Sequence, residues 1–365
     1  MINPNDISII LQGSIIKTET LKCLKSIRKY LPNAEIILST WEGAEVEELE
    51  GLFDILILNK DPEAVLMTKF KMTYNNLNRQ LLSTQEGLKR ATRKYAMKLR
   101  SDLILTSDKF LKYFDEFSKR SENYQLFTHK VLVPALFSRY SLKVCKNQAS
   151  FNVPFHPSDW WMFGLREDLN KYYLDTPLAP EPYFTKYFEL EENRNKISPF
   201  NDIKTEFTPE QYLCYEVFHR NFSDIYMKDV TDYSDELMEK SRECFVNNFI
   251  VLEFEQSGIY LKKYPFSKNE KFSGEQYIGL YNFHRYEEEY KKYCDSDYEI
   301  TVHSPLFDNE NLGYALLRVY KHVENFTCIK TPILQRLEQL FIGIPISIIS
   351  YLVVVIKEKY GAKIK

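Results

Sequence analysis

The sequence is poor in cysteine and does not open with an apolar leader. Six cysteines occur among 365 residues, and none of them lies in a Cys-x-x-Cys pair. The sequence therefore predicts neither a disulfide framework nor a zinc cluster, and a reducing cytosol is the expected compartment. The opening residues MINPNDISIILQG carry neither the basic nor the long apolar region of a secretion signal, so they predict the start of a strand.

The sequence also lacks an excess of positive charge and an early glycine-rich basic loop. A formal net charge of -3 gives no global field for nucleic acid, so no nucleic-acid partner is expected. The missing phosphate-binding loop argues against a nucleotidyltransferase. Hydrophobic residues make up 44% and charged residues 27% of the chain, which is the composition of a globular protein with a buried core.

Short apolar runs alternate with helical stretches in the first third of the chain. The spacing predicts strands at 6–13, 34–43, 54–62 and 96–105, with helices over 17–30 and 75–94. This alternation predicts an α/β fold with a doubly wound parallel sheet. Further along, the pattern predicts a long surface loop at 176–209, a helix at 208–222 and a hairpin made by 247–254 and 258–265.

Polar residues follow the first three predicted strands. They are Gln12, Gly13, Ser39, Thr40, Trp41, Glu42, Asn59 and Asp61. Ligands of open α/β sheets bind beyond the carboxyl ends of the strands, so this edge is a candidate site for a nucleotide base and ribose. The alternative is that these residues only make turns, in which Asn, Asp, Ser and Gly are common.

A second group of residues carries a resemblance to a known family. The segment NRQLLSTQEGLKRATRKYAMKLRSDLIL resembles the donor-site region of GT-A glycosyltransferases, in which a helix leads to a strand that ends in an acidic motif. The chain is more similar still to the WavE lipopolysaccharide synthesis family, at 9–13, 26–42, 76–88, 98–103 and 156–160. The resemblance covers roughly the first two-thirds of the chain, and its motifs are specific when taken together.

The resemblance implies a nucleotide-sugar-binding domain of GT-A-like, Rossmann-type α/β fold. The residues expected to bind the donor are Gln12, Gly13, Thr40, Trp41, Asn78, Arg79, Lys98, Arg100 and Asp102. Negative charge grows on the departing diphosphate, so Asp102 is expected to hold a divalent cation, Mg²⁺ or Mn²⁺, while Arg79, Lys98 and Arg100 hold phosphate. Arg100 stands where the motif has its first acidic residue. Replacement of the metal ion by an arginine that neutralises the diphosphate is therefore an alternative that stays open. A surface Arg-Asp pair is the other alternative.

The third group is the segment from His156 to Trp161. An inverting transferase needs a carboxylate as general base, and Asp159 is our first candidate. Glu210, near the start of the predicted helix, is the rival base. Trp160 or Trp161 is expected to stack on an acceptor sugar. The alternatives are that Asp159 caps a turn and that Glu210 serves the helix dipole.

These features predict three segments and one function. Residues 1–260 form the GT-A-like domain, 261–335 a mixed C-terminal appendage, and 336–365 an apolar helix with a basic tail. The expected function is transfer of a sugar from a nucleotide-sugar to a lipid-linked or oligosaccharide acceptor in bacterial lipopolysaccharide core or capsule. The alternative is a catalytically silent sugar- or nucleotide-binding module of a surface-assembly complex.

The segment 340–356 decides the expected location. It contains no charge, and Lys357, Lys359, Lys363 and Lys365 follow it. An apolar helix beside cationic side chains suits contact with the anionic cytoplasmic leaflet, so the protein is expected at the cytoplasmic face of the inner membrane. The alternative is a helix buried in the core or against a partner subunit.

Overall fold

The computed structural model describes residues 2–68, 73–144, 149–185, 205–261 and 280–301. The chain divides into one compact unit over residues 1–299 and a second over 300–365, and the fold below is that of the first unit. The predicted tail at 336–365 lies outside the described residues, and so does most of the appendage predicted at 261–335. The three predicted segments therefore stay predictions.

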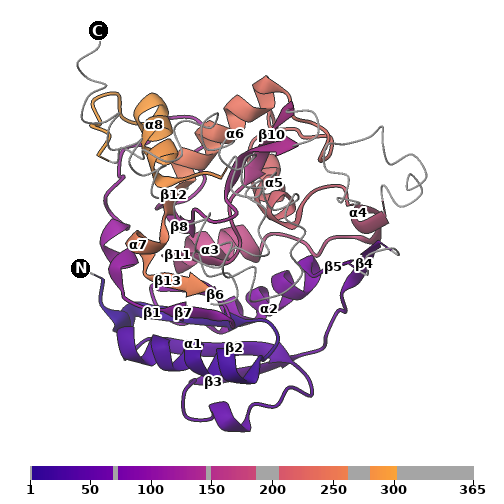
Figure 1. The fold of residues 1–365 in the computed structure, drawn as a ribbon, viewed down its shortest axis with the longest axis vertical. Helices are drawn as coiled ribbons and strands as arrows, with labels where there is room; N and C mark the ends of the chain where they lie inside the picture. The colour runs from indigo at the N-terminus through magenta and orange to yellow at the C-terminus, as the bar shows by residue number, and fades with distance from the viewer. Residues whose placement is uncertain (1, 69–72, 145–148, 186–204, 262–279, 302–365) are drawn as a thin grey trace, which may run out of the picture. The chain divides into compact units, whose positions relative to one another are not determined.

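A seven-stranded sheet forms the centre of the first unit (Figure 1). Its strands run in the order β12-β8-β11-β6-β1-β2-β3. β11 is antiparallel to both of its neighbours, and the other paired strands are parallel. The bounds are β1 (Ile7–Gln12), β2 (Glu35–Trp41), β3 (Ile55–Asn59), β6 (Tyr95–Arg100), β8 (Val131–Pro134), β11 (Trp161–Leu165) and β12 (Phe249–Leu252). The predicted α/β fold is confirmed, whereas the predicted parallel sheet is parallel only in part, because β11 runs antiparallel to its neighbours.

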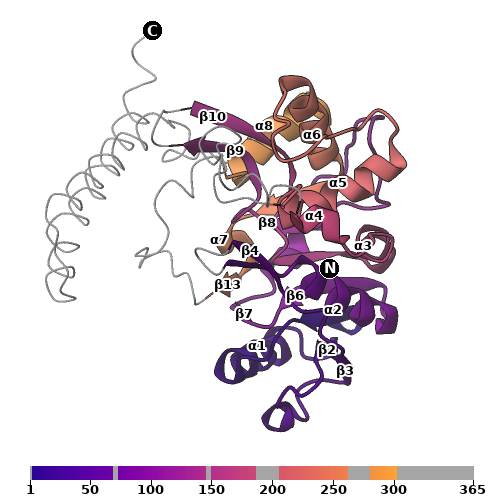
Figure 2. The same cartoon turned by 90° about the vertical axis from the view of Figure 1, so that its right-hand side faces the viewer.

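Helices cover both faces of the sheet beside β1. α1 (Lys17–Tyr30) lies on one side and α2 (Leu77–Arg90) on the other (Figure 2). All six residues of β1 are buried, as its β-branched composition predicts for a central parallel strand. A Cβ placed on Gly87 would lie 2.3 Å from Cγ2 of Ile10, so the glycine allows α2 to approach the sheet closely.

The remaining elements surround this core. Two-stranded pairs are formed by β4 (Val65–Thr68) with β5 (Thr73–Asn75), by β9 (Arg139–Val144) with β10 (Ala149–His156), and by β7 (Leu103–Leu105) with β13 (Ile259–Leu261). The other helices are α3 (Arg166–Tyr173), α4 (Glu181–Thr185), α5 (Pro209–Asn221), α6 (Asp235–Asn248), α7 (Phe254–Ser257) and α8 (Phe283–Tyr293). Short 3₁₀ turns lie at Pro4–Asp6, Glu47–Leu49 and Lys109–Tyr113.

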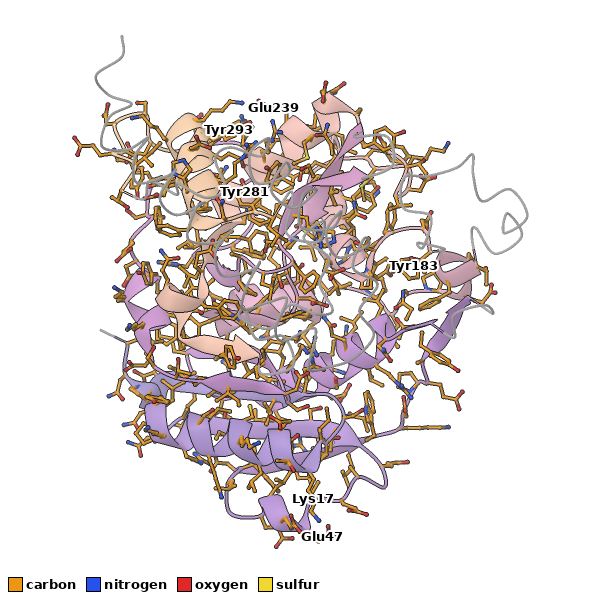
Figure 3. All side chains as sticks on the ribbon, in the orientation of Figure 1. Lys17, Glu47, Tyr183, Glu239, Tyr281 and Tyr293 are labelled. Atoms are coloured by element: carbon orange, nitrogen blue, oxygen red, sulfur yellow. The ribbon has the colours of Figure 1, made fainter. Side chains whose placement is uncertain are left out.

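Three details of the sequence-based prediction are wrong. The run at 96–105 is two strands, because the chain turns at Ser101 and Asp102 and β7 leaves the central sheet to pair with β13. The predicted hairpin does not form, because α7 and left-handed Gly258 separate β12 from β13 and each strand pairs elsewhere. The predicted surface loop contains α4, whose Tyr183 (labelled in Figure 3) is buried and donates a hydrogen bond to the carbonyl oxygen of Phe207 at 2.9 Å.

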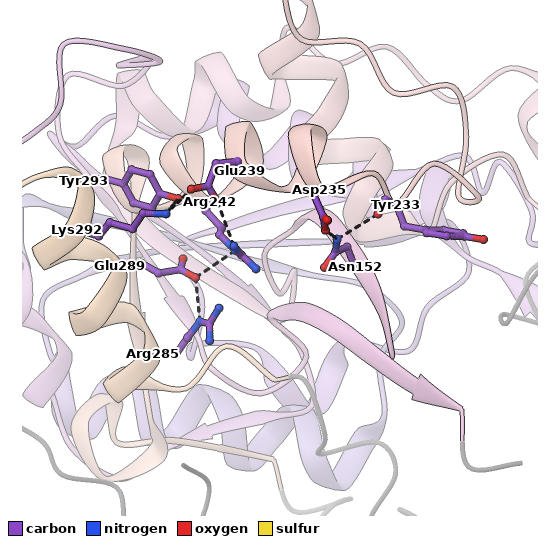
Figure 4. Close-up of polar contacts among 9 residues, drawn as sticks. All are labelled: Asn152, Tyr233, Asp235, Glu239, Arg242, Arg285, Glu289, Lys292 and Tyr293. Atoms are coloured by element: carbon purple, nitrogen blue, oxygen red, sulfur yellow. Dashed lines mark hydrogen bonds and ion pairs between the residues drawn. The ribbon is translucent and has the colours of Figure 1, made fainter. Parts of the chain in front are cut away.

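Ion pairs join α8 to α6 (Figure 4). Glu289 accepts a hydrogen bond from Nε of Arg285 at 2.9 Å and lies 3.5 Å from Nε of Arg242. Glu239 of α6 pairs with Lys292 of α8 and with Arg242 at 3.1 Å. α8 belongs to the predicted appendage, yet it packs on α6 within the first unit. Within the described ranges, no helix is both long and apolar enough to cross a bilayer.

Candidate active site

The carboxyl ends of β1, β2, β3 and β6 meet at one edge of the sheet, as predicted. β11 runs the opposite way, so its first residue, Trp161, lies level with Leu99 near the end of β6. The backbone N–H of Arg100 donates to the carbonyl oxygen of Trp160 at 3.3 Å. The sheet thereby brings the polar residues at the strand ends together with residues 159–161. These residues lie close together because β11 runs antiparallel to β6 in the seven-stranded sheet.

A cavity of about 330 Å³ opens beyond β1 and β2. It is lined by Ser14, Ile15, Lys17, Thr40, Trp41, Glu42, Gly43, Ala44 and Glu45. Oγ1 of Thr40 is buried without a hydrogen-bond partner, and Nε1 of Trp41 donates to Oγ of Ser14 at 3.2 Å. A concave space with an indole in its wall suits a flat ligand, whereas the hydroxyl of Thr40 lies behind that wall, since Thr40 has no exposed surface. The sequence predicted Thr40 and Trp41 in this place but did not identify Ser14.

Ser14 connects this cavity to the end of β6. Its carbonyl oxygen accepts a hydrogen bond from Oγ of Ser101 at 2.8 Å. Gly13 precedes it with a φ of 110°, a conformation that favours glycine. Gln12 is buried, and its Oε1 accepts a hydrogen bond from Oγ of Ser83 at 3.0 Å, which fixes β1 to α2. The predicted donor role of Gln12 and Gly13 stays a prediction.

The start of α2 lies on the other flank, and its predicted donor residues already have protein partners. Arg79 holds Asp61 through Nε at 2.7 Å and through Nη2 at 2.5 Å. This pairing lowers the pKa of Asp61 and raises that of Arg79. The amide of Asn78 donates to the carbonyl oxygen of Ala179 at 2.9 Å and accepts from its N–H at 2.8 Å. Both side chains hold the fold together at the edge of the site, and their predicted donor contacts stay predictions.

Arg100 and Asp102 form a two-pronged ion pair. Nε and Nη2 of Arg100 donate to Oδ1 and Oδ2 of Asp102 at 3.0 and 2.7 Å. The guanidinium carbon lies 5.2 Å from the ring centroid of Trp160. Among the described residues, no three or more His, Cys, Asp or Glu side chains are grouped so that they could hold a metal ion. The divalent cation that the sequence predicted at Asp102 stays a prediction.

Five charged or titratable side chains gather next to this pair, and we call them the buried charged cluster. They are Lys98, Arg139, His156, Asp159 and Glu210. Lys98 has no exposed surface, and its ammonium group donates to the carbonyl oxygen of Asp159. Burial lowers the pKa of Lys98 to about 8, against the opposing effect of Asp159. The lysine therefore still carries its charge at neutral pH.

The two carboxylates predicted as rival bases belong to this one cluster. Burial and the neighbouring Asp159 raise the pKa of Glu210 to about 8, so Glu210 is mainly protonated at neutral pH. Nε2 of His156 lies 3.7 Å from Oε2 of Glu210. Burial and the nearby Arg139 lower the pKa of His156 to about 3, so the imidazole is neutral and this contact is no ion pair. The sequence ranked Asp159 above Glu210, and the ranking stays a prediction.

The start of α5 fixes the position of Glu210. Thr208 caps the helix by accepting from the N–H of Gln211 at 3.2 Å, and Pro209 is the first helical residue, as predicted. The amide of Gln211 also donates to the carbonyl oxygen of Pro154 at 3.0 Å. Glu210 is therefore placed by a helix start that is tied to β10.

Sequence reasoning missed Arg139 and Phe137. Arg139 lies opposite His156 in the β9–β10 pair, and its Nη1 is buried without a hydrogen-bond partner. Phe137 has a φ of 67°, and its ring centroid lies 4.9 Å from that of Trp160. Non-glycine residues with positive φ are uncommon and gather at functional sites. No local motif predicts either residue: Arg139 reaches the site through the pairing of β9 with β10, and Phe137 lies two residues before it.

The two tryptophans lie in different surroundings. Trp160 packs between Phe137 and Arg100 at the edge of the site. Trp161 is 2% exposed, and its ring centroid lies 6.2 Å from that of Phe110 inside the core. Trp160 is itself only 7% exposed, so both predicted acceptor contacts stay predictions.

Comparisons with known proteins point to one family. A family model described as WavE lipopolysaccharide synthesis matches residues 7–320, while no curated protein matches the sequence. Staphylococcus aureus TarS is 11% identical with a TM-score of 0.27, covering 68% of this chain and 35% of TarS. The glycosyltransferase GlyE of Streptococcus pneumoniae is 14% identical with a TM-score of 0.24, covering 54% of this chain and 41% of GlyE.

A third similar structure is the 4-diphosphocytidyl-2C-methyl-D-erythritol synthase of Anaerococcus prevotii. It is 12% identical with a TM-score of 0.28, covering 59% of this chain and 96% of that protein. The chain thus spans little more than a third of TarS and about two fifths of GlyE. Likeness at these TM-scores carries no argument about function, and the family match stands without it.

Proposed function

We propose that this chain, which belongs to the WavE lipopolysaccharide synthesis family, is a GT-A-like glycosyltransferase that moves a sugar from a nucleotide-sugar to a bacterial surface glycan. The observation that carries the proposal is the buried charged cluster near the end of β6, on the same edge of the sheet as the cavity beyond β1 and β2. Open α/β sheets bind ligands at this edge. Lipopolysaccharide core and capsule glycans are the acceptors that the family name and the sequence favour.

The donor is proposed to lie with its base in the cavity and its diphosphate toward β6. The indole of Trp41 in the cavity wall supports a base or ribose there. Ser14 links this wall to Ser101, which lies between Arg100 and Asp102. A nucleotide seated there would direct its diphosphate toward the guanidinium of Arg100.

The reaction follows from the protonation states in the cluster. An acceptor hydroxyl attacks the anomeric carbon, the bond from that carbon to the phosphate oxygen breaks, and the electron pair leaves with the nucleoside diphosphate. Asp159 takes the proton of the acceptor hydroxyl as general base. Glu210 is mainly protonated at neutral pH and donates a hydrogen bond instead of accepting this proton. Trp160 provides an aromatic face for the acceptor sugar.

The test combines donor turnover with one substitution. Purified protein is incubated with a panel of nucleotide-sugars, and release of nucleoside diphosphate is measured with and without a lipopolysaccharide-core acceptor. We expect Asp159→Asn to lower turnover by about 10²–10⁴-fold with little change in donor affinity. Asp115→Asn, at a side chain that is 81% exposed, is the matched control. If the wild-type protein binds a donor and never cleaves it, the chain is a silent binding module.

We also propose contact with the cytoplasmic face of the inner membrane. The support is the sequence alone, in which the uncharged segment 340–356 precedes four lysines. Each lysine near an anionic surface contributes about 1 kcal/mol to binding. Full-length protein is expected to sediment with phosphatidylglycerol vesicles at low salt, and truncation at Arg336 is expected to abolish this. Equal sedimentation of both proteins would refute the contact.

A further inference from the structure

The Arg100–Asp102 pair occupies the place where a GT-A-like enzyme would bind a metal ion. Both carboxylate oxygens of Asp102 accept hydrogen bonds from the same guanidinium, and the Asp102 side chain is only 11% exposed. Mg²⁺ and Mn²⁺ need a nearly complete shell of oxygen ligands. A metal at Asp102 would have to share the carboxylate with the guanidinium, and it would have Arg100 beside it as a repelling charge.

The same pair presents Arg100 as a ready-made cation. Nε and Nη2 are directed at Asp102, whereas no hydrogen bond recorded among the described residues uses Nη1. The ring of Trp160 lies 5.2 Å from the guanidinium carbon and supports the group from the side. Arginine remains charged at all working pH values and matches the geometry of phosphate oxygens. Asp102 and Trp160 therefore hold a phosphate-binding group in one orientation.

We propose that the transferase works without a divalent cation and that Arg100 supplies the positive charge that stabilises the departing diphosphate. This inference rests on the proposed glycosyltransferase function. Preorganised donors aimed at developing charge are among the largest contributions to catalysis, and they need no rearrangement during the reaction. Asp102 is then a positioning residue that orients Arg100.

The neighbouring charges agree with this assignment. Lys98 is fully buried two residues before Arg100 on β6 and adds a second cation. Arg139 adds a third, with a buried nitrogen that has no partner. The negative charges are Asp102 and Asp159, because Glu210 is mainly protonated at neutral pH. The site therefore carries more positive than negative charge before the anionic donor arrives.

The first experiment measures binding and turnover with and without metal. Affinities for UDP, GDP and ADP are measured by calorimetry in EDTA and again in Mn²⁺, and donor turnover is measured in both buffers. We expect the affinity for the preferred nucleotide and the turnover to agree within about twofold between the buffers. Turnover that EDTA abolishes and Mn²⁺ restores would overturn the inference while confirming the glycosyltransferase.

Substitutions at Arg100 test independently whether this residue binds the diphosphate. Arg100→Ala is expected to weaken nucleoside diphosphate binding in EDTA by roughly 10–100-fold, the effect of losing a charge-assisted contact. Arg100→Asp restores the acidic pair of the GT-A motif, so it is expected to bind Mn²⁺, detected by electron paramagnetic resonance, whereas the wild type does not. Arg90→Ala, at an exposed residue ending α2, is the control.

The two failures can be told apart. If no nucleotide-sugar is turned over in either buffer, the proposed function fails, and nucleotide binding by Arg100→Ala in EDTA still decides the role of Arg100. Unchanged nucleotide affinity in Arg100→Ala, or Mn²⁺ binding by the wild type, would refute the metal-independent site. A melting curve for each variant confirms that it is folded.

Discussion

Glu210→Gln tests the protonation state on which the proposed reaction depends. The structure raises the pKa of Glu210 from 4.5 to about 8, because the group is buried and lies near Asp159. The raised pKa favours the protonated form of this side chain at pH 7. Glutamine keeps the size of the protonated acid and its ability to donate a hydrogen bond. We therefore expect turnover at pH 7 to stay within about threefold of the wild type.

The same substitution has a stability signature whose sign can be worked out. The folded protein holds a proton on Glu210 that the unfolded chain releases above about pH 4.5. Its contribution to stability is therefore complete below pH 4.5 and is lost as pH rises to about 8. At about 1.4 kcal/mol per pKa unit, the loss has an upper limit of about 5 kcal/mol. Glu210→Gln carries no titrating proton and should not show this loss.

The assay is urea unfolding of both proteins between pH 4.5 and 8.5, with turnover measured on the same preparations. The difference in the free energy of unfolding should shift in favour of Glu210→Gln as pH rises, and most of the shift should occur between pH 5 and 8. Glu288→Gln, at a side chain of α8 that is 48% exposed, is the control. A large loss of turnover at pH 7 without that stability shift would show that Glu210 is ionised and acts as the base.

Three further predictions concern other positions. Burial lowers the pKa of Lys130 to about 7 and leaves its ammonium without a hydrogen-bond partner. Lys130→Met should therefore raise the free energy of unfolding in urea by about 1–4 kcal/mol at pH 7, and should remove the gain in stability that the wild type shows between about pH 7 and 10.5. Gly87→Ala should lower the free energy of unfolding by about 1–3 kcal/mol, because its Cβ would lie 2.3 Å from Ile10; an unchanged melting curve would contradict the close packing of α2 on β1. Thr40→Val should raise the melting temperature, because it removes a fully buried hydroxyl that has no hydrogen-bond partner; an unchanged melting temperature would contradict the missing partner.

The sequence was sufficient for the elements whose stability is local. β1, β2 and β3 are apolar runs of strand length, and α1 has its buried residues on one face, so periodicity alone located them. The cap of α5 was equally visible, because a threonine followed by proline begins helices for local chemical reasons. Long-range pairing was not visible. β12 and β13 are close in sequence, yet their partners β8 and β7 lie more than a hundred residues earlier.

The difference between local patterns and long-range pairing also explains which site residues could be predicted from the sequence. Lys98, Arg100 and Asp102 lie on one strand and its following turn, so their meeting with Asp159 required only the position of β11. Arg139 enters the site because β9 pairs with β10 and places it opposite His156. That pairing is a tertiary property, so an arginine of the catalytic region looked like any other arginine in the sequence.

Residue 100 bears on whether a metal ion or an arginine neutralises the departing diphosphate in the proposed mechanism. The sequence alone left two interpretations of an arginine at an acidic motif position, which were a weakened metal site and an arginine-based substitute. In the structure one guanidinium engages both oxygens of Asp102 and rests beside Trp160, and on this geometry we base the proposal of an arginine-based substitute. A metal-binding aspartate needs further oxygen ligands around the cation, whereas a positioning aspartate needs a partner to orient. Asp102 has the second arrangement, so Asp102→Asn should weaken nucleoside diphosphate binding in EDTA as well as in Mn²⁺. If instead it weakened binding only in Mn²⁺, Asp102 would be a metal ligand.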